Sequence, residues 1–294
     1  MGDHQELLTT LDSRFRDLLE DHRRRRTTWS CHELIPWERG RSYTDHPWSK
    51  SEMTERPEVS EVLKLNLLTE DNLPSYHHAL GKLFDSGSAL SEWTRQWSAE
   101  EAQHGFALRA YLLVSRACDP QGLEADRMAT MTSGWSNPYD GPVELFVYTT
   151  MQELATRISH RNAGKAAEDE VCFELMKRIA SDENSHYLFY RSAVSAMLEL
   201  RPDLVAVAVD KVVRNFEMPG TMIPRFRFKA ATAALLGVYN TELHVEQVIK
   251  PLLREWNLES LTLHGAADEA RHRALAYPDA LLKSCSTRRR QSNT

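Results

Sequence analysis

The sequence predicts an all-α protein whose centre is a bundle of four long helices, extended by further helices within a single domain. Apolar residues recur at the three-to-four-residue spacing of one helix face, for example in residues 59–68, 145–158 and 172–189. No segment has the alternating pattern, rich in Val, Ile and Thr, that is typical of strands. Two short motifs, 82 residues apart, place titratable side chains inside these helical stretches.

The two motifs have the form Glu-x-x-His. They run from Glu101 to His104 and from Glu183 to His186. Residues three apart lie on the same face of a helix, so the carboxylate and the imidazole of one motif can bind the same metal ion. A single motif of this kind is common by chance, and the argument therefore depends on what surrounds each one.

Each motif follows another glutamate at nearly the same distance. Glu70 lies 31 residues before Glu101, and Glu153 lies 30 residues before Glu183. At about 1.5 Å per helical residue, this length suits the end of one helix, a turn and the start of a returning helix. Six side chains can then meet at one level, as in the ferritin-like di-iron carboxylate bundles. The predicted metal ligands are Glu70, Glu101, His104, Glu153, Glu183 and His186.

Other histidines do not fit this repeat. A third Glu-x-x-His motif ends at His272, but the residue thirty positions before its glutamate is Tyr239, and its neighbours are charged. We therefore expect His272 to lie outside the metal site. His160 is expected to be a packed histidine that is not a ligand, and His244, which has no partner pattern, is expected at the surface.

Composition excludes several classes of function. The 294 residues carry a net charge of −6, which does not indicate nucleic acid as a partner. No run of about eighteen apolar residues predicts a transmembrane helix, and the charged N-terminus does not resemble a secretory signal. Four widely separated cysteines indicate reduced thiols and a cytoplasmic location. No glycine-rich nucleotide motif is present, so electrons for any redox reaction must come from another protein.

We divide the chain into an N-terminal helix with a basic segment (1–28), a helical domain (29–286) and a disordered tail (287–294). The first segment ends in four consecutive arginines, which are either a solvated helix end or a docking patch for an acidic partner. These candidate partner-binding residues are Arg23, Arg24, Arg25 and Arg26.

Prolines indicate where two helices should change course. Pro74 predicts a kink one turn after Glu70, and the last helix is expected to end near Leu275, just before Pro278. The strip from Arg225 to Lys229 is a second candidate for a basic docking surface.

Several stretches occur in the same order as in one known family. They span residues 69–76, 99–105, 148–156, 158–160, 181–186, 218–219 and 236–239. On these stretches the sequence resembles the soluble acyl-acyl-carrier-protein desaturases of plastids and actinobacteria, from about Trp29 to Leu261.

The resemblance implies a homodimer with two iron ions per subunit, which receives electrons from ferredoxin. Dioxygen is reduced, and a double bond enters an acyl chain held on acyl carrier protein. Glu101 and Glu183 would bridge the irons. Asp182 would orient a ligand imidazole, Trp29 would link to Asp182 on an electron route, and Thr156 would face the oxygen-binding side.

Two other functions remain open. The same cluster could hydroxylate or otherwise oxygenate a specialised-metabolite intermediate bound to a carrier protein, since both outcomes use the same oxidant. A ferritin-like iron-binding role is disfavoured by the chain length and by the Trp29–Asp182 match. The helix after Glu70 lines the acyl channel in the resembling family, so a buried Lys82 would argue against a plain fatty-acyl chain.

Overall fold

The computed structural model describes residues 2–53, 55–139 and 141–292, and every regular element within them is helical. The predicted all-α class is therefore confirmed. The α-helices are α1 (Gly2–Thr10), α2 (Asp12–Arg25), α3 (Pro57–Asp71), α4 (Leu73–Gly81), α5 (Ala89–Val114), α6 (Pro120–Ser133), α7 (Pro142–Ala166), α8 (Glu170–Leu200), α9 (Pro202–Asn215), α10 (Phe226–Leu235), α11 (Thr241–His244), α12 (Lys250–Glu255) and α13 (Gly265–Ser292).

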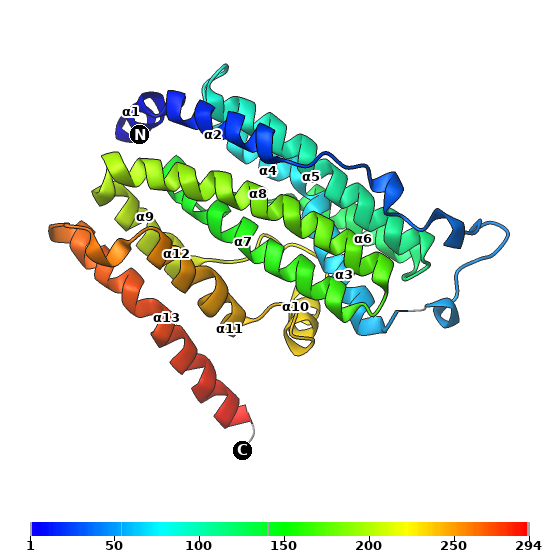
Figure 1. Ribbon diagram of the computed structural model, residues 1–294. Helices are drawn as coiled ribbons and strands as arrows, with labels where there is room; N and C mark the ends of the chain where they lie inside the picture. Colours follow the sequence, from blue (N-terminus) through cyan, green and yellow to red (C-terminus); the bar gives the residue numbers. More distant parts are fainter. Residues whose placement is uncertain (1, 54, 140, 293–294) are drawn as a thin grey trace.

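Helices α3, α5, α7 and α8 form the central bundle (Figure 1). The long helices α7 and α8 lie side by side, α3 packs against both α5 and α7, and α5 packs against α8. Outside this ring, α2 packs against α5 and α8, α10 packs against α3, and α9 and α13 cover another side. Different helices therefore cover different sides of the bundle: α2 lies on the side of α5 and α8, and α10 lies on the side of α3.

Local sequence signals fix the starts of the bundle helices. The hydroxyl of Ser88 accepts the backbone N–H of Ser91 at the start of α5, and the carboxylate of Asp169 accepts that of Val171 at the start of α8. Such caps satisfy N–H groups that have no partner within the helix. Helix α7 begins with Pro142, whose fixed φ suits the first helical turn.

The kink predicted at Pro74 is confirmed. Helix α3 ends at Asp71 and α4 begins at Leu73, with Asn72 between them outside both helices. Pro74 lies at the start of α4, where its missing N–H costs no helical hydrogen bond. Glu70 consequently lies in the last turn of α3.

The N-terminal segment contributes an apolar stripe to the main core, formed by Leu7, Leu8, Leu11, Phe15 and Leu19. The structure divides the single expected helix into α1 and α2 at Leu11. Phe15 is completely buried and stacks on Phe146 of α7 with ring centroids 6.3 Å apart. These apolar residues of α1 and α2 are therefore part of the same hydrophobic core as the bundle.

The expectation that Pro278 ends the last helix is wrong, because α13 continues through Pro278 to Ser292. A proline inside a helix removes one hydrogen bond, but Tyr277, Leu281 and Leu282 pack against the core on both sides of it. Residues 287–292 of the expected disordered tail thus lie in α13, whereas residues 293–294 lie outside the described residues.

Among the described residues, no helix combines the length and the apolar character needed to cross a bilayer. All four cysteines are free thiols, and Cys31, Cys118 and Cys172 are buried. The expectation of unpaired cysteines is therefore confirmed.

Replacing Phe15 should test how firmly α2 belongs to the core. We expect Phe15→Ala to lower the free energy of unfolding by about 3–5 kcal/mol, because a buried aromatic ring is replaced by a cavity. Urea unfolding followed by circular dichroism measures this. Leu235→Ala, at a residue that is 88% exposed, is the matched control and should change little. Equal effects of the two variants would contradict the packing described above.

Candidate metal centre

The six predicted ligands converge inside the bundle, and each is buried. They form two overlapping groups, and within each group one potential ligand atom per residue lies within 4.8 Å of the others. The first group is Glu70, Glu101, His104 and Glu183, and the second is Glu101, Glu153, Glu183 and His186. Glu101 and Glu183 belong to both groups, which is the arrangement that two neighbouring ions with shared carboxylates require.

His104 faces the carboxylates with one ring nitrogen and leaves the other for a hydrogen bond. Its Nδ1 lies 3.1 Å from Glu101 Oε2 and 3.5 Å from Glu183 Oε1. Its Nε2 lies 3.3 Å from Asp182 Oδ2. Metal-binding histidines commonly use the second nitrogen in this way, which fixes the ring and its tautomer.

His186 has the same orientation. Its Nδ1 lies 2.7 Å from Glu101 Oε1 and 3.6 Å from Glu153 Oε2. Its Nε2 lies 2.9 Å from Glu100 Oε2. Both histidines of the Glu-x-x-His motifs therefore present Nδ1 to the centre of the bundle.

Several atoms at the centre are buried without a hydrogen bond. Charged or polar atoms in this condition are costly unless a cation or another partner satisfies them. The atoms are Glu101 Oε1, Glu153 Oε2, Glu183 Oε1 and His186 Nδ1. Carboxylate and imidazole donors suit iron and similar divalent ions, so the side chains present fit such a group.

Burial and neighbouring charge shift the pKa values of the four carboxyl groups in two directions. Burial raises the pKa of Glu70 to about 8 and that of Glu153 well above its usual range. Burial would also raise the pKa values of Glu101 and Glu183, but nearby histidines outweigh it and lower both. Burial thus favours the protonated form of Glu70 and Glu153, and the histidines favour the ionised form of Glu101 and Glu183.

Burial would lower the pKa values of His104 and His186, but the surrounding carboxylates outweigh it and raise both well above the usual range. The carboxylates thus favour the charged form of both imidazoles, and this pairing of opposite charges offsets part of the cost of burying the groups.

The structure also places the three other predicted site residues beside the cluster. Trp29 Nε1 donates to Asp182 Oδ2 at 2.6 Å, and Asp182 contacts His104 as described above. The hydroxyl of Thr156 donates to Glu183 Oε2 at 2.8 Å. His160 is buried as expected, and its Nε2 lies 2.9 Å from Glu70 Oε1.

A small cavity of about 80 Å³ lies beside Glu70, Thr156 and His160. Apolar side chains form most of its remaining wall. A larger open cavity of about 1120 Å³ adjoins it, since Met218, Ala230 and Tyr239 line both. Tyr277, Leu281 and Leu282 of α13 also line the larger cavity.

The expectation that His244 lies at the surface is wrong. Its ring stacks on Phe216 with centroids 4.7 Å apart and lies 2.8 Å from the Tyr239 hydroxyl, and it lines the larger cavity. Burial lowers the pKa of His244 to about 4, so the ring is neutral at pH 7. His272, in contrast, is exposed as expected.

In both candidate basic surfaces, some of the charged side chains are paired with carboxylates or buried. The four arginines of residues 23–26 already form ion pairs: Arg23 with Glu20 and Glu92, Arg24 and Arg25 with Asp21, and Arg26 with Glu100. Within residues 225–229, Lys229 is buried and lies 3.5 Å from carboxylate oxygens of Glu61 and Asp126. Lys229 is therefore not part of a docking surface, although Arg225 and Arg227 are exposed.

These features define a helical bundle with a buried carboxylate–histidine cluster of the kind that binds metal ions. Residues 3–294 match the family described as Fatty acid desaturase, so the chain belongs to this family.

One relative is the putative acyl-(acyl-carrier-protein) desaturase DesA1 of Mycobacterium tuberculosis, 37% identical over 277 residues that cover 89% of this chain and 81% of the relative. Another is the chloroplastic palmitoyl-(acyl-carrier-protein) 4-desaturase of Coriandrum sativum, 30% identical, with 90% and 74% covered. The X-ray structure of the putative acyl-ACP desaturase DesA2 of Mycobacterium tuberculosis H37Rv has the same fold: TM-score 0.73, 22% identity, and 87% and 96% of the two chains covered.

Metal binding should release protons, because burial and neighbouring charges hold the pKa values of Glu70, Glu153, His104 and His186 above their usual ranges in the metal-free protein. Loading with Fe²⁺ at pH 7 under anaerobic conditions should therefore release protons from these groups. Affinity should rise with pH as they lose their protons. Calorimetry in buffers of different ionisation enthalpy counts the protons. A release near zero, with metal bound, would contradict the raised pKa values.

Proposed function

We propose that the protein is a dioxygen-dependent desaturase that introduces a double bond into an acyl chain carried on acyl carrier protein. The observation that carries the proposal is the pair of four-residue groups that share Glu101 and Glu183. We assign two iron ions per chain to these residues, with Glu70 and His104 on one ion and Glu153 and His186 on the other. When bound, the irons would supply the dioxygen-activating chemistry of the reaction.

The cavities give the acyl chain a place beside the cluster. The inner cavity is mainly apolar and lies against Glu70 and Thr156, and the outer cavity leads to the surface. Apolar walls suit a hydrocarbon chain and exclude water from it. Thr156, which lines the inner cavity and donates to Glu183, would hold that carboxylate on the oxygen-binding side.

A buried Lys82 would have argued against a plain fatty-acyl chain, but Lys82 is exposed. His77 and His78, on the same helix after Glu70, are also exposed, so none of the three places a charge in the cavities. A plain fatty-acyl chain therefore remains compatible with the residues around the cluster. The apolar lining of the inner cavity against Glu70 and Thr156, with the larger cavity next to it, supports an enzyme over a ferritin-like iron binder.

Electrons would reach the cluster from a ferredoxin-like donor along Trp29, Asp182 and His104. Trp29 is partly exposed, and hydrogen bonds connect it through Asp182 to the ring of His104. We further propose a homodimer in the cytoplasm, with the arginines of residues 23–26 contributing to the approach of an acidic carrier protein.

Polar side chains in the outer cavity favour a second candidate function. Asn240, Glu242 and His244 line it together with the apolar residues. They would suit a carrier-bound intermediate that bears polar groups, and its oxygenation or hydroxylation by the same cluster is the alternative outcome.

Intact mass spectrometry of acyl carrier proteins distinguishes these outcomes. After incubation with iron-loaded protein, reduced ferredoxin and dioxygen, we expect the acyl chain to lose two hydrogen atoms, because two adjacent methylenes become a double bond. A gain of one oxygen atom would instead support hydroxylation. No change over a panel of fatty-acyl chains, with two irons bound, would contradict the fatty-acyl proposal.

Substitutions at the cluster test the ligand assignment. We expect His104→Ala and Glu183→Gln each to abolish tight binding of at least one iron, because a donor from the shared site is lost. Iron per chain, measured by inductively coupled plasma mass spectrometry, is the readout. His272→Ala removes the histidine of the third Glu-x-x-His motif and should leave the iron content unchanged. Loss of iron in His272→Ala would show that the wrong motif was chosen.

A further inference from the structure

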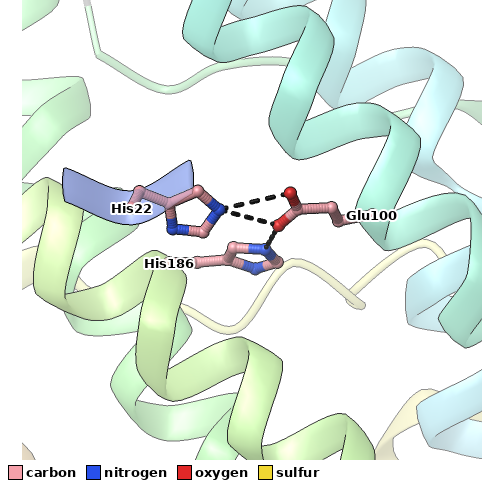
Figure 2. A group of neighbouring side chains, drawn as sticks. All are labelled: His22, Glu100 and His186. Carbon is pink, nitrogen blue, oxygen red and sulfur yellow. Dashed lines mark hydrogen bonds and ion pairs between the residues drawn. The ribbon is translucent and has the colours of Figure 1, made fainter. Parts of the chain in front are cut away.

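Glu100 is a buried carboxylate that belongs to neither four-residue group of the cluster. Both of its oxygens accept from His22 Nε2, at 3.0 and 3.2 Å, and one also contacts His186 Nε2 at 2.9 Å (Figure 2). Arg26 Nε lies 3.1 Å from its other oxygen, which also accepts from Gln96. The carboxylate is therefore surrounded by four donors.

These contacts determine how the ring of His186 is held. A neutral imidazole carries one N–H, so when Nδ1 serves as a ligand, Nε2 carries the hydrogen and donates it to Glu100. Glu100 in turn keeps its place because His22 and Arg26 hold it. His22 is itself buried, and its ring packs edge-on against Trp93 with centroids 4.9 Å apart.

The arrangement repeats what surrounds His104. Asp182 directly precedes Glu183, as Glu100 directly precedes Glu101, and it accepts from His104 Nε2. An aromatic N–H from residues 22–29 and an arginine bind each of these two carboxylates. The donors are Trp29 and Arg178 at Asp182, and His22 and Arg26 at Glu100.

We propose that His22 and Arg26 are positioning residues, which hold Glu100 where it fixes the ring and tautomer of His186 for metal binding. The end of α2 thereby completes the site of the ion assigned to His186, as Trp29 does for the ion assigned to His104. The inference rests on the proposed role of His186 as a metal ligand. It gives a function to α2 that no motif in the sequence indicates.

The same three residues could be suspected of holding a third metal ion, since potential ligand atoms of His22, Glu100 and His186 lie within 4.8 Å of one another. Two observations argue against a third ion. The guanidinium of Arg26 already binds Glu100, and a second cation there would be repelled. The Nε2 of His186 must also keep its hydrogen when Nδ1 is a ligand. A hydrogen-bonded carboxylate satisfies every donor without a third ion.

The test is a stepwise titration of the full-length metal-free protein with Co²⁺, followed by its visible absorption bands. We expect His22→Ala to weaken the binding of one of two ions by about 10–100-fold and to alter only that ion's spectrum. His22→Gln, whose amide can donate to Glu100, should restore most of the affinity. Thermal unfolding of the metal-free variants reports separately on folding.

Two comparisons identify the ion and the mechanism. His186→Ala should affect the same ion as His22→Ala, and combining the two should add little, because both act through one ring. Arg26→Ala should weaken this ion too, whereas Arg25→Ala, next to it but paired with the half-buried Asp21, should not. Trp29→Phe should instead affect the other ion.

Wild-type binding of both ions by His22→Ala would overturn the inference, and so would a wild-type count of three ions that falls to two in this variant. Equal weakening of both ions would indicate a merely structural role and would also overturn it. None of these readouts uses acyl carrier protein. A protein that binds two ions, shows the expected variant effects and makes no desaturated product would retain the inference and lose the proposed function.

Discussion

The burial of four carboxyl groups and two imidazoles inside one apolar bundle is the constraint on which the rest of the structure depends. Such groups are costly away from water unless opposite charges, hydrogen bonds or metal ions satisfy them. Here carboxylates and imidazoles lie against one another, which shifts the pKa values of Glu101 and His104 in favour of their charged forms. The helices must also approach closely, and at Gly164 of α7 a Cβ atom would lie 2.8 Å from the Cβ of Met176 on α8.

The bundle alone does not hold its histidines, because both Nε2 atoms bind carboxylates that residues 22–29 also bind. The apolar stripe of α1 and α2 therefore has a consequence beyond core stability. Phe15 and its neighbours anchor α2 against α5 and α8, and this anchoring brings His22 and Arg26 to Glu100. Packing far from the cluster thus sets the geometry of a predicted ligand.

The repeat was enough to identify the six clustered residues, because a spacing of about thirty residues relates facing helices directly. It also contained a signal for Glu100, which precedes Glu101 as Asp182 precedes Glu183. His22 and Arg26 gave no signal, since no local pattern specifies where α2 docks. Pro278 and His244 were misjudged for a similar reason: tertiary packing overrides the helix-breaking tendency of the proline and stacks the half-buried histidine on Phe216.

In the proposed reaction, the electron route and the acyl chain would lie on different sides of the bundle. Both histidines lie on α5 and α8, which α2 covers, and this face holds the hydrogen-bonded route from Trp29. Helices α3 and α7 each contribute one lone glutamate, and α10 covers α3 beside the inner cavity. Electrons and acyl chain would then approach from opposite sides. An acyl chain on the glutamate face would leave the partners that hold His104 and His186 undisturbed, so substrate binding and histidine positioning need not compete.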